Sequence, residues 1–237
     1  MIDRAGAFRY ARGVKSAVAE IERQLARAGT AERKRVAEWY FPTRLAVAGV
    51  AVPDLRWIAR SIKVAPGEVL PLARALAKSG GFETRAVAYE LVARNKTPLD
   101  TRTVEELGRG NDNWGLVDSF SVLVAGPAWR TGAVSDAAVR KWARSRDRWW
   151  RRTALVSTVA LNAKSRGGTG DVGRTLAICR MLADDPDEMV VKALSWALRE
   201  LAKREPAAVR AFLDERPLHP RVVREVRRKL ETGRKNL

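Results

Sequence analysis

The sequence has almost none of the residues that build disulfides or metal centres. Its 237 residues include one cysteine, Cys179, and one histidine, His219. A lone cysteine excludes an internal disulfide and is typical of a protein in a reducing compartment. A structural zinc site usually needs four Cys or His ligands, so that class of site is excluded as well. We therefore expect the protein to use neither a metal nor another cofactor.

The sequence also lacks a long apolar run. No stretch without a charged residue exceeds the 11 positions of residues 119–129, whereas a membrane-spanning helix requires roughly 20. The first ten residues include charged side chains where a signal peptide would have an apolar stretch. We expect a cytoplasmic protein with no membrane segment.

Negative charge is scarce as well. Lys and Arg number 45 against 27 Asp and Glu, which gives a formal net charge of +18. Such an excess is typical of proteins that bind a polyanion, which in the cytosol usually means nucleic acid. Ribosomal proteins and proteins that bind anionic membranes show the same balance, so the charge indicates a class of partner but no activity. We expect a nucleoid-associated location.

The densest basic stretch lies at residues 140–152, where seven Lys and Arg residues are interleaved with three tryptophans. Arginines can bind phosphates, and indole rings can pack on sugars or bases, so this composition favours a nucleic-acid surface. The alternative is a solvated helix face whose tryptophans point into the core.

Apolar residues recur at spacings of three and four along most of the chain, the pattern of amphipathic helices. No alternating stretch predicts a strand, and glycines at 80–81, 110 and 167–168 stand where helices should end. We predict an all-α fold that forms one domain over residues 1–237. The predicted helices are Lys15–Ala28, Ala31–Phe41, Asp54–Lys63, Gly67–Lys78, Phe82–Asn95, Arg102–Arg109, Trp114–Ala125, Asp136–Ser145, Arg148–Ala163, Asp171–Ala183, Asp187–Arg204, Ala207–Asp214 and Pro220–Thr232.

Several of these segments resemble one another. Residues 83–88, 150–155 and 190–195 each place a basic residue before a small apolar run, and residues 113–125 fit the same register. The matched positions are Arg85, Asp118, Arg152 and Lys192, with separations of 33, 34 and 40 residues. Such a period is typical of two-helix solenoid repeats. We therefore expect an α-α superhelix in which these positions form a row along a basic concave groove.

One acidic residue is placed unusually. Asp118 lies in an otherwise apolar stretch, four residues after Trp114, so the two share one helix face. A carboxylate in such a place needs a cationic partner, for which Arg152 is the candidate, or has a functional role. Lys192 and Trp196 show the same spacing on a later helix. A structural carboxylate and core tryptophans remain the alternative interpretation.

Three segments together resemble a known family. Asn-Trp-Gly-Leu-Val-Asp at 113–118, Trp-Trp-Arg-Arg-Thr-Ala at 149–154 and the segment 191–200 are similar to the signature segments of bacterial AlkD-type DNA glycosylases, which are built of HEAT-like repeats. Residues 39–41 and 47–53 resemble the family's N-terminal helix and the turn after it. The resemblance covers about residues 35–205. It departs at Asn113 and Gly115, where the family commonly has a second tryptophan and an extra acid.

The resemblance implies an activity. The family removes positively charged N3- or N7-alkylpurines (the 3-methyladenine and 7-methylguanine type) from duplex DNA held in the concave groove, without a pocket for a flipped base. Asp118 matches its catalytic acid, Trp114 and Trp196 its cleft tryptophans, and Arg152 its cleft arginine. Tyr40 and Lys192 match positions that approach the DNA. The basic pattern adds Arg85, Arg148 and Arg151 as predicted DNA contacts.

Two other functions remain open at the sequence level. A non-catalytic relative would bind damaged or branched DNA without releasing a base. An interaction scaffold would use the positive charge to bind RNA or an acidic protein. We expect a monomer in each case.

Overall fold

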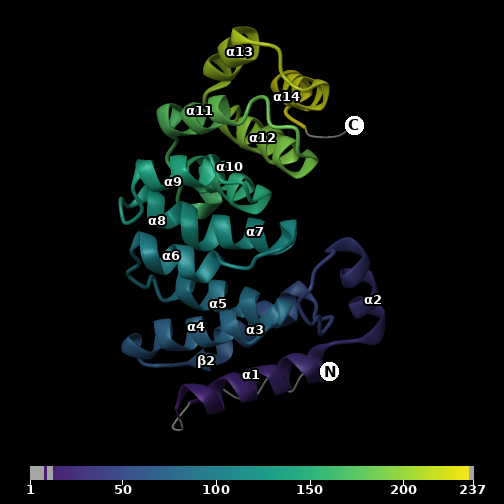
Figure 1. Cartoon of the computed structure of the whole chain (residues 1–237), viewed down its shortest axis with the longest axis vertical. Helices are drawn as coiled ribbons and strands as arrows, with labels where there is room; N and C mark the ends of the chain where they lie inside the picture. Colours follow the sequence, from purple (N-terminus) through teal and green to yellow (C-terminus); the bar gives the residue numbers. More distant parts are fainter. Residues whose placement is uncertain (1–7, 10–12, 235–237) are drawn as a thin grey trace. The chain divides into compact units, whose positions relative to one another are not determined.

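The computed structural model describes residues 8, 9 and 13–234 and divides the chain into two compact units, residues 1–124 and residues 125–237. Helices make up most of both units (Figure 1). The predicted all-α, solenoid-type fold is confirmed. Whether the two units behave as one domain over residues 1–237 stays a prediction. None of the helices in the described part of the chain has the length and apolar character needed to cross a membrane.

The first unit is built around helix α5, Phe82–Arg94, which packs against α3, α4 and α7. Its buried face includes Val87, Ala88, Tyr89 and Leu91, all inaccessible to solvent. The regular helices of this unit are α1 Val14–Ala28, α2 Ala31–Tyr40, α3 Val52–Ser61, α4 Val69–Lys78, α5, α6 Thr101–Gly108 and α7 Trp114–Phe120, with a 3-10 turn at Pro66–Glu68 before α4.

The second unit has helix α10, Arg148–Asn162, at its centre. Every residue from Arg152 to Asn162 in this helix is buried, because α8, α9, α11 and α12 all pack against it. The remaining helices are α8 Gly126–Arg130, α9 Asp136–Ala143, α11 Val172–Met181, α12 Glu188–Leu201, α13 Pro206–Glu215 and α14 Pro220–Thr232, with a 3-10 turn at Lys164–Arg166.

Most predicted helices agree with the structure to within a few residues, but one region was wrong. The helix predicted over Trp114–Ala125 ends at Phe120 and continues as a π-helical turn, Ser121–Ala125. The short helix α8 then follows, and the sequence analysis did not predict it. Pro127 lies in the first turn of α8, where a missing N–H costs nothing.

The structure also contains one short sheet that the sequence did not predict. Strands β1, Phe8–Arg9, and β2, Ile62–Lys63, pair in parallel. Two residues give no alternating pattern, so this strand pairing leaves no signal in the sequence. The segment Ile62–Lys63 was predicted as the end of the helix that in the structure stops at Ser61.

The predicted helix ends at glycine are confirmed. Gly80, Gly110 and Gly167 all have positive φ, between 74° and 86°, a conformation that glycine adopts without steric cost. Side chains cap the starts of many helices, and the acceptors include Thr30, Asp100, Asn113, Ser135, Asp147 and Asp187.

Candidate functional site

Helix α7 of the first unit carries both Trp114 and Asp118. Asn113 begins the helix as its N-cap, because its side-chain Oδ1 accepts a hydrogen bond from Leu116 N at 3.0 Å. Trp114 is the first helical residue, and Asp118 follows one turn later. Both side chains are only partly buried. The structure therefore confirms that the two share one face of a helix, as their spacing predicts.

Trp114 belongs to a cluster of aromatic rings. Its ring centre lies 4.6 Å from that of Phe41 and 5.0 Å from that of Tyr40, and Phe41 also packs on Phe82 at 5.4 Å. Trp114 Nε1 donates a hydrogen bond to Tyr40 O at 3.3 Å. The predicted DNA contact Tyr40 is thus brought directly against the predicted site residue Trp114. The sequence analysis did not predict Phe41 and Phe82 as members of this cluster.

The departures at Asn113 and Gly115 have structural reasons. A Cβ at position 115 would lie 2.5 Å from Phe41 Cε1, a separation that real Cβ atoms essentially never show. Only glycine therefore lets the Phe41 ring lie against the start of α7. Asn113 is 1% exposed and caps the helix, so this position is used for local structure rather than for an exposed aromatic side chain.

Two carboxylates hold the loop that carries Phe41. Asp112 accepts hydrogen bonds from Thr43 Oγ1 at 2.6 Å and from Arg44 N at 2.7 Å. Burial tends to raise the pKa of Asp112, but these hydrogen bonds and one from Asn113 hold it below its ordinary value. Neither the sequence pattern nor the resemblance singled out Asp112.

The second carboxylate, Glu83, is 3% exposed and accepts hydrogen bonds from the backbone N–H groups of Ala48, Gly49 and Val50 at 2.8–3.2 Å. Gly49 has φ +77°, and a Cβ there would lie 2.5 Å from Lys34 N. The glycine-to-proline turn at residues 47–53 is therefore fixed by one buried carboxylate and one close backbone approach.

Helix α2 presents an unusual surface next to this loop. None of its residues is buried, and Val36, Trp39 and Tyr40 are 59%, 80% and 52% exposed. The rings of Trp39 and Tyr40 stack with their centres 6.2 Å apart. Large apolar side chains with this much exposure are typical of a binding surface.

Arg85 lies elsewhere in the first unit and is buried, with 9% of its surface exposed. Its Nη1 donates to Arg109 O at 2.8 Å. The sequence predicted Arg85 as one of a row of side chains on an open surface, whereas the structure places it inside the unit, beside the turn that follows α6.

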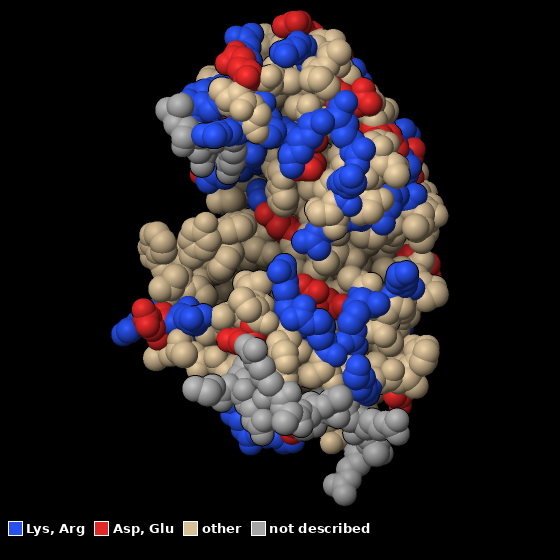
Figure 2. Space-filling view, turned by 180° about the vertical axis from the view of Figure 1, so that it is seen from behind, with Lys and Arg blue, Asp and Glu red and all other residues tan. Residues whose placement is uncertain are grey.

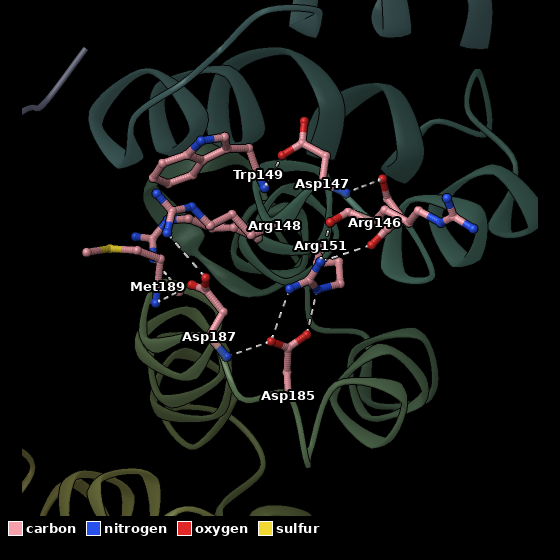
Figure 3. Close-up of polar contacts among 10 residues, drawn as sticks. Arg146, Asp147, Arg148, Trp149, Arg151, Asp185, Asp187 and Met189 are labelled. Carbon is pink, nitrogen blue, oxygen red and sulfur yellow. Dashed lines mark hydrogen bonds and ion pairs between the residues drawn. The ribbon is translucent and has the colours of Figure 1, made fainter.

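In the second unit, the predicted arginines gather where α10 begins (Figure 3). Arg151 Nε contacts Asp185 Oδ2 at 2.6 Å, and its Nη1 donates to Ser145 O and Arg146 O. These bonds join the turn before α10 to the loop before α12. Arg151 therefore links two loops of this unit, and its predicted phosphate contact stays a prediction.

Arg148 and Arg152 differ in exposure. The Arg148 side chain is 51% exposed, lies 4.7 Å over the Trp149 ring and contacts Asp187 Oδ2 at 3.3 Å. Arg152 is 5% exposed, and its Nη1 donates to Met189 O. Arg148 is thus the more accessible of the two.

Helix α12 carries the remaining predicted residues. Lys192 Nζ contacts Glu188 Oε1 at 2.8 Å, and Trp196 follows one turn later, partly buried. Arg152 and Lys192 each stand fifth in their helices, as Asp118 does in α7. The predicted register is therefore found in three helices. Trp114 and Asp118 belong to the first unit, and Arg152 and Trp196 to the second.

The basic stretch at residues 140–152 has features of both interpretations, a core tryptophan and a charged surface. Trp142 is 3% exposed and packs on Trp150 with ring centres 5.3 Å apart, so it belongs to the core. Arg140, Arg144 and Arg146 are exposed. Lys and Arg side chains also dominate the charged atoms on the face shown in Figure 2.

No group of three His, Cys, Asp or Glu side chains suited to a metal occurs among the described residues.

Comparisons with known proteins agree with the resemblance. The family model described as "DNA alkylation repair enzyme" matches residues 21–230. Among solved structures, a predicted DNA alkylation repair enzyme from Enterococcus faecalis is similar with a TM-score of 0.70 and 17% identity, covering 86% of this chain and 97% of that one. AlkD2 from Streptococcus mutans is similar with a TM-score of 0.57 and 17% identity, covering 93% and 98%.

These structural likenesses concern the fold alone. A search of curated protein sequences finds no match. The family model spans both units and every predicted site residue from Tyr40 to Trp196. The chain belongs to the DNA alkylation repair enzyme family.

Proposed function

We propose that this protein is a DNA glycosylase that hydrolyses the N-glycosidic bond of cationic N3- or N7-alkylpurines in duplex DNA. The observation that carries the proposal is the pairing of Trp114 and Asp118 on one face of α7, with Trp114 set in an aromatic cluster beside Tyr40. Membership of the DNA alkylation repair enzyme family supports it, as does the net charge of +18.

The chemistry suits a carboxylate that works without a metal. Alkylation at N7 or N3 makes the purine cationic, so it leaves as a neutral base when the C1′–N bond breaks and takes both bonding electrons. The sugar then develops oxocarbenium character, and the carboxylate of Asp118 would stabilise that charge. Water adds to C1′ and gives up a proton to the carboxylate, which yields an abasic site.

The aromatic and basic residues have distinct proposed roles. An indole face attracts a cation, so Trp114 and Trp196 would each stabilise the charged nucleotide by about 0.5–1 kcal/mol. Arg152 would bind a phosphate beside the lesion. Tyr40, Arg148 and Lys192 would contact the DNA backbone. We propose that the lesion is processed without base flipping and that the protein acts as a monomer.

The decisive experiment measures base release from a duplex that carries a single 7-methylguanine, read as strand cleavage after alkali. Asp118→Asn removes the negative charge and keeps the shape of the side chain. We expect excision to fall by at least a hundredfold, while duplex affinity changes less than threefold.

Asp214→Asn is the matched control, because Asp214 is an exposed carboxylate on α13. It should excise at the wild-type rate. If the wild type and Asp118→Asn both bind the duplex and neither releases a base, the glycosylase proposal is wrong and the protein is a binder of damaged DNA. Equal excision by the two would refute the role of Asp118.

A further inference from the structure

A strongly basic cleft lies in the first unit, between helices α4 and α6. Its volume is about 610 Å³. Five cationic side chains line it against two carboxylates, those of Glu105 and Glu106. Of the lining residues, the proposed function uses none, and the sequence analysis predicted a role only for Arg85.

Two of the five cations are already paired. Arg74 Nε contacts Glu106 Oε2 at 2.8 Å, and Lys78 Nζ contacts Glu106 Oε1 at 3.2 Å. One carboxylate therefore serves both cations. The remaining three are the guanidinium groups of Arg85, Arg102 and Arg109.

Arg85 is the most unusual of these three. It is more than nine-tenths buried, and its Nε has no hydrogen-bond partner among the described residues. Its Nη1 is bonded to neutral oxygens only, those of Arg109 O and Asn111 Oδ1. A buried guanidinium with an N–H group that has no hydrogen-bond partner is costly, and an anion bound beside it would offset that cost.

The turn after α6 keeps this guanidinium open to the cleft. Gly110 has φ +80°, and a Cβ at this position would lie 3.1 Å from Arg85 Nη2. Because Gly110 has no side chain, the guanidinium of Arg85 is not crowded on this side. Arg102 and Arg109 are exposed and line the same cleft, so three guanidinium groups face one space.

We propose that this cleft binds a phosphate group, held by Arg85, Arg102 and Arg109. The planar guanidinium forms paired hydrogen bonds with phosphate oxygens, and that geometry makes arginine the preferred residue for such sites. The phosphate comes either from the DNA backbone or from a small phosphate compound. The first source rests on the proposed function, and the second does not.

The test uses two probes and two variants of the full chain. Pyrophosphate binding is measured by calorimetry, and binding of an undamaged duplex by fluorescence anisotropy over a range of salt concentrations. Arg102→Gln/Arg109→Gln changes exposed side chains only, so we expect the fold to persist. Arg85→Met removes the buried charge, and its helix content is checked by circular dichroism. The amide resonance of Gly110 reports on the cleft itself.

A small-phosphate site requires pyrophosphate to shift the Gly110 resonance and to bind at least tenfold more weakly in both variants. A backbone site requires the duplex to shift that resonance while pyrophosphate does not. The double variant should then flatten the plot of log affinity against log salt by about 2, because each lost phosphate contact removes about 0.9.

The control is Lys164→Gln/Arg210→Gln, which removes two exposed cations that lie outside the cleft. An equal loss of binding in this control, or no shift at Gly110 with either probe, would overturn the proposal. Base excision is measured on the same proteins. If the wild type fails to excise, the glycosylase proposal falls, while the pyrophosphate result still decides whether the cleft binds phosphate.

Discussion

At the scale of single residues, the candidate site depends on residues that take no part in the proposed reaction. Gly115 is the clearest case, because the Phe41 ring occupies the space where a side chain would stand. Phe41 is itself confined by Phe82 and Trp114. A substitution at Gly115 would therefore displace Phe41 and, through it, Trp114.

Gly115→Ala should lower the free energy of unfolding by about 1–2 kcal/mol. Alanine in place of a helical glycine gains up to about 1 kcal/mol, but forcing an extra methyl group into a packed cluster costs about 1–3 kcal/mol. Urea unfolding measures the difference, and the tryptophan fluorescence of the native state should shift because Trp114 moves.

Gly173→Ala is the matched control for that change. Gly173 lies within α11, and the nearest atom to its Cβ position is Asp171 Oδ1 at 3.9 Å, an ordinary contact. Here the helix gain is unopposed, so the variant should be more stable by about 0.5–1 kcal/mol. If Gly115→Ala were stabilising as well, the packing of Phe41 would not be what requires glycine at this position.

At the scale of elements, the loop between α2 and α3 depends on carboxylates as well as on the apolar packing of Phe41. Glu83 and Asp112 together accept hydrogen bonds from four backbone N–H groups of this loop. Helix α2 has no buried residue of its own, so these carboxylates fix the segment that places Tyr40 and Phe41.

Asp112 gives this loop a pH dependence. Its pKa in the folded protein lies below the ordinary value of 3.8, so its contribution to stability is complete above that value and is lost as the pH falls through the lower, folded pKa. Asp112→Asn should cost about 1–3 kcal/mol at neutral pH, because hydrogen bonds to a charged acceptor are lost.

The difference in unfolding free energy between the wild type and Asp112→Asn should stay constant between pH 7 and pH 5 and shrink below about pH 4. Chemical unfolding at a series of pH values measures it. Asp214→Asn, at an exposed carboxylate, is measured alongside as the control for removing a charge. A difference that persisted unchanged to pH 3 would show that the charge on Asp112 does not hold the loop.

The sequence predicts the elements well where local signals are strong. The helices predicted to begin at Trp114 and Asp187 begin in the structure at Trp114 and Glu188. The break at Ser121–Ala125 has no such signal, because an apolar run ending in proline fits a continuous helix, and only the surrounding contacts select a π turn there.

The candidate site is predictable from the sequence only in part. The spacing of Trp114 and Asp118 places them on one face without further information. The spacing cannot show that Arg85 is buried or that Arg151 forms an ion pair, because both depend on contacts between residues far apart in the chain. The pairing of Arg151 with Asp185, 34 residues later, is one such contact.

At the scale of the whole molecule, the net charge of +18 dominates. Many of the Lys and Arg side chains that carry it are exposed, on both units. If duplex DNA is the partner, neutralising its phosphates releases counter-ions, and affinity must fall steeply with salt.

We expect duplex affinity to fall by about 10³–10⁵ between 50 and 200 mM salt, as for a protein that contacts six to ten phosphates. Fluorescence anisotropy with an undamaged duplex measures this dependence. A slope of less than about 2 in the plot of log affinity against log salt would instead favour the interaction scaffold with an acidic protein partner.

The burial of the single cysteine affects how readily alkylating agents modify the protein. A protein of alkylation repair meets the same electrophiles that damage DNA, and a thiolate is the side chain that those reagents attack most readily. Cys179 is inaccessible to solvent, and burial raises the pKa of its thiol to about 12. The folded chain therefore presents no thiolate to an alkylating agent among its described residues, so it should remain unmodified at cysteine while the DNA around it is methylated.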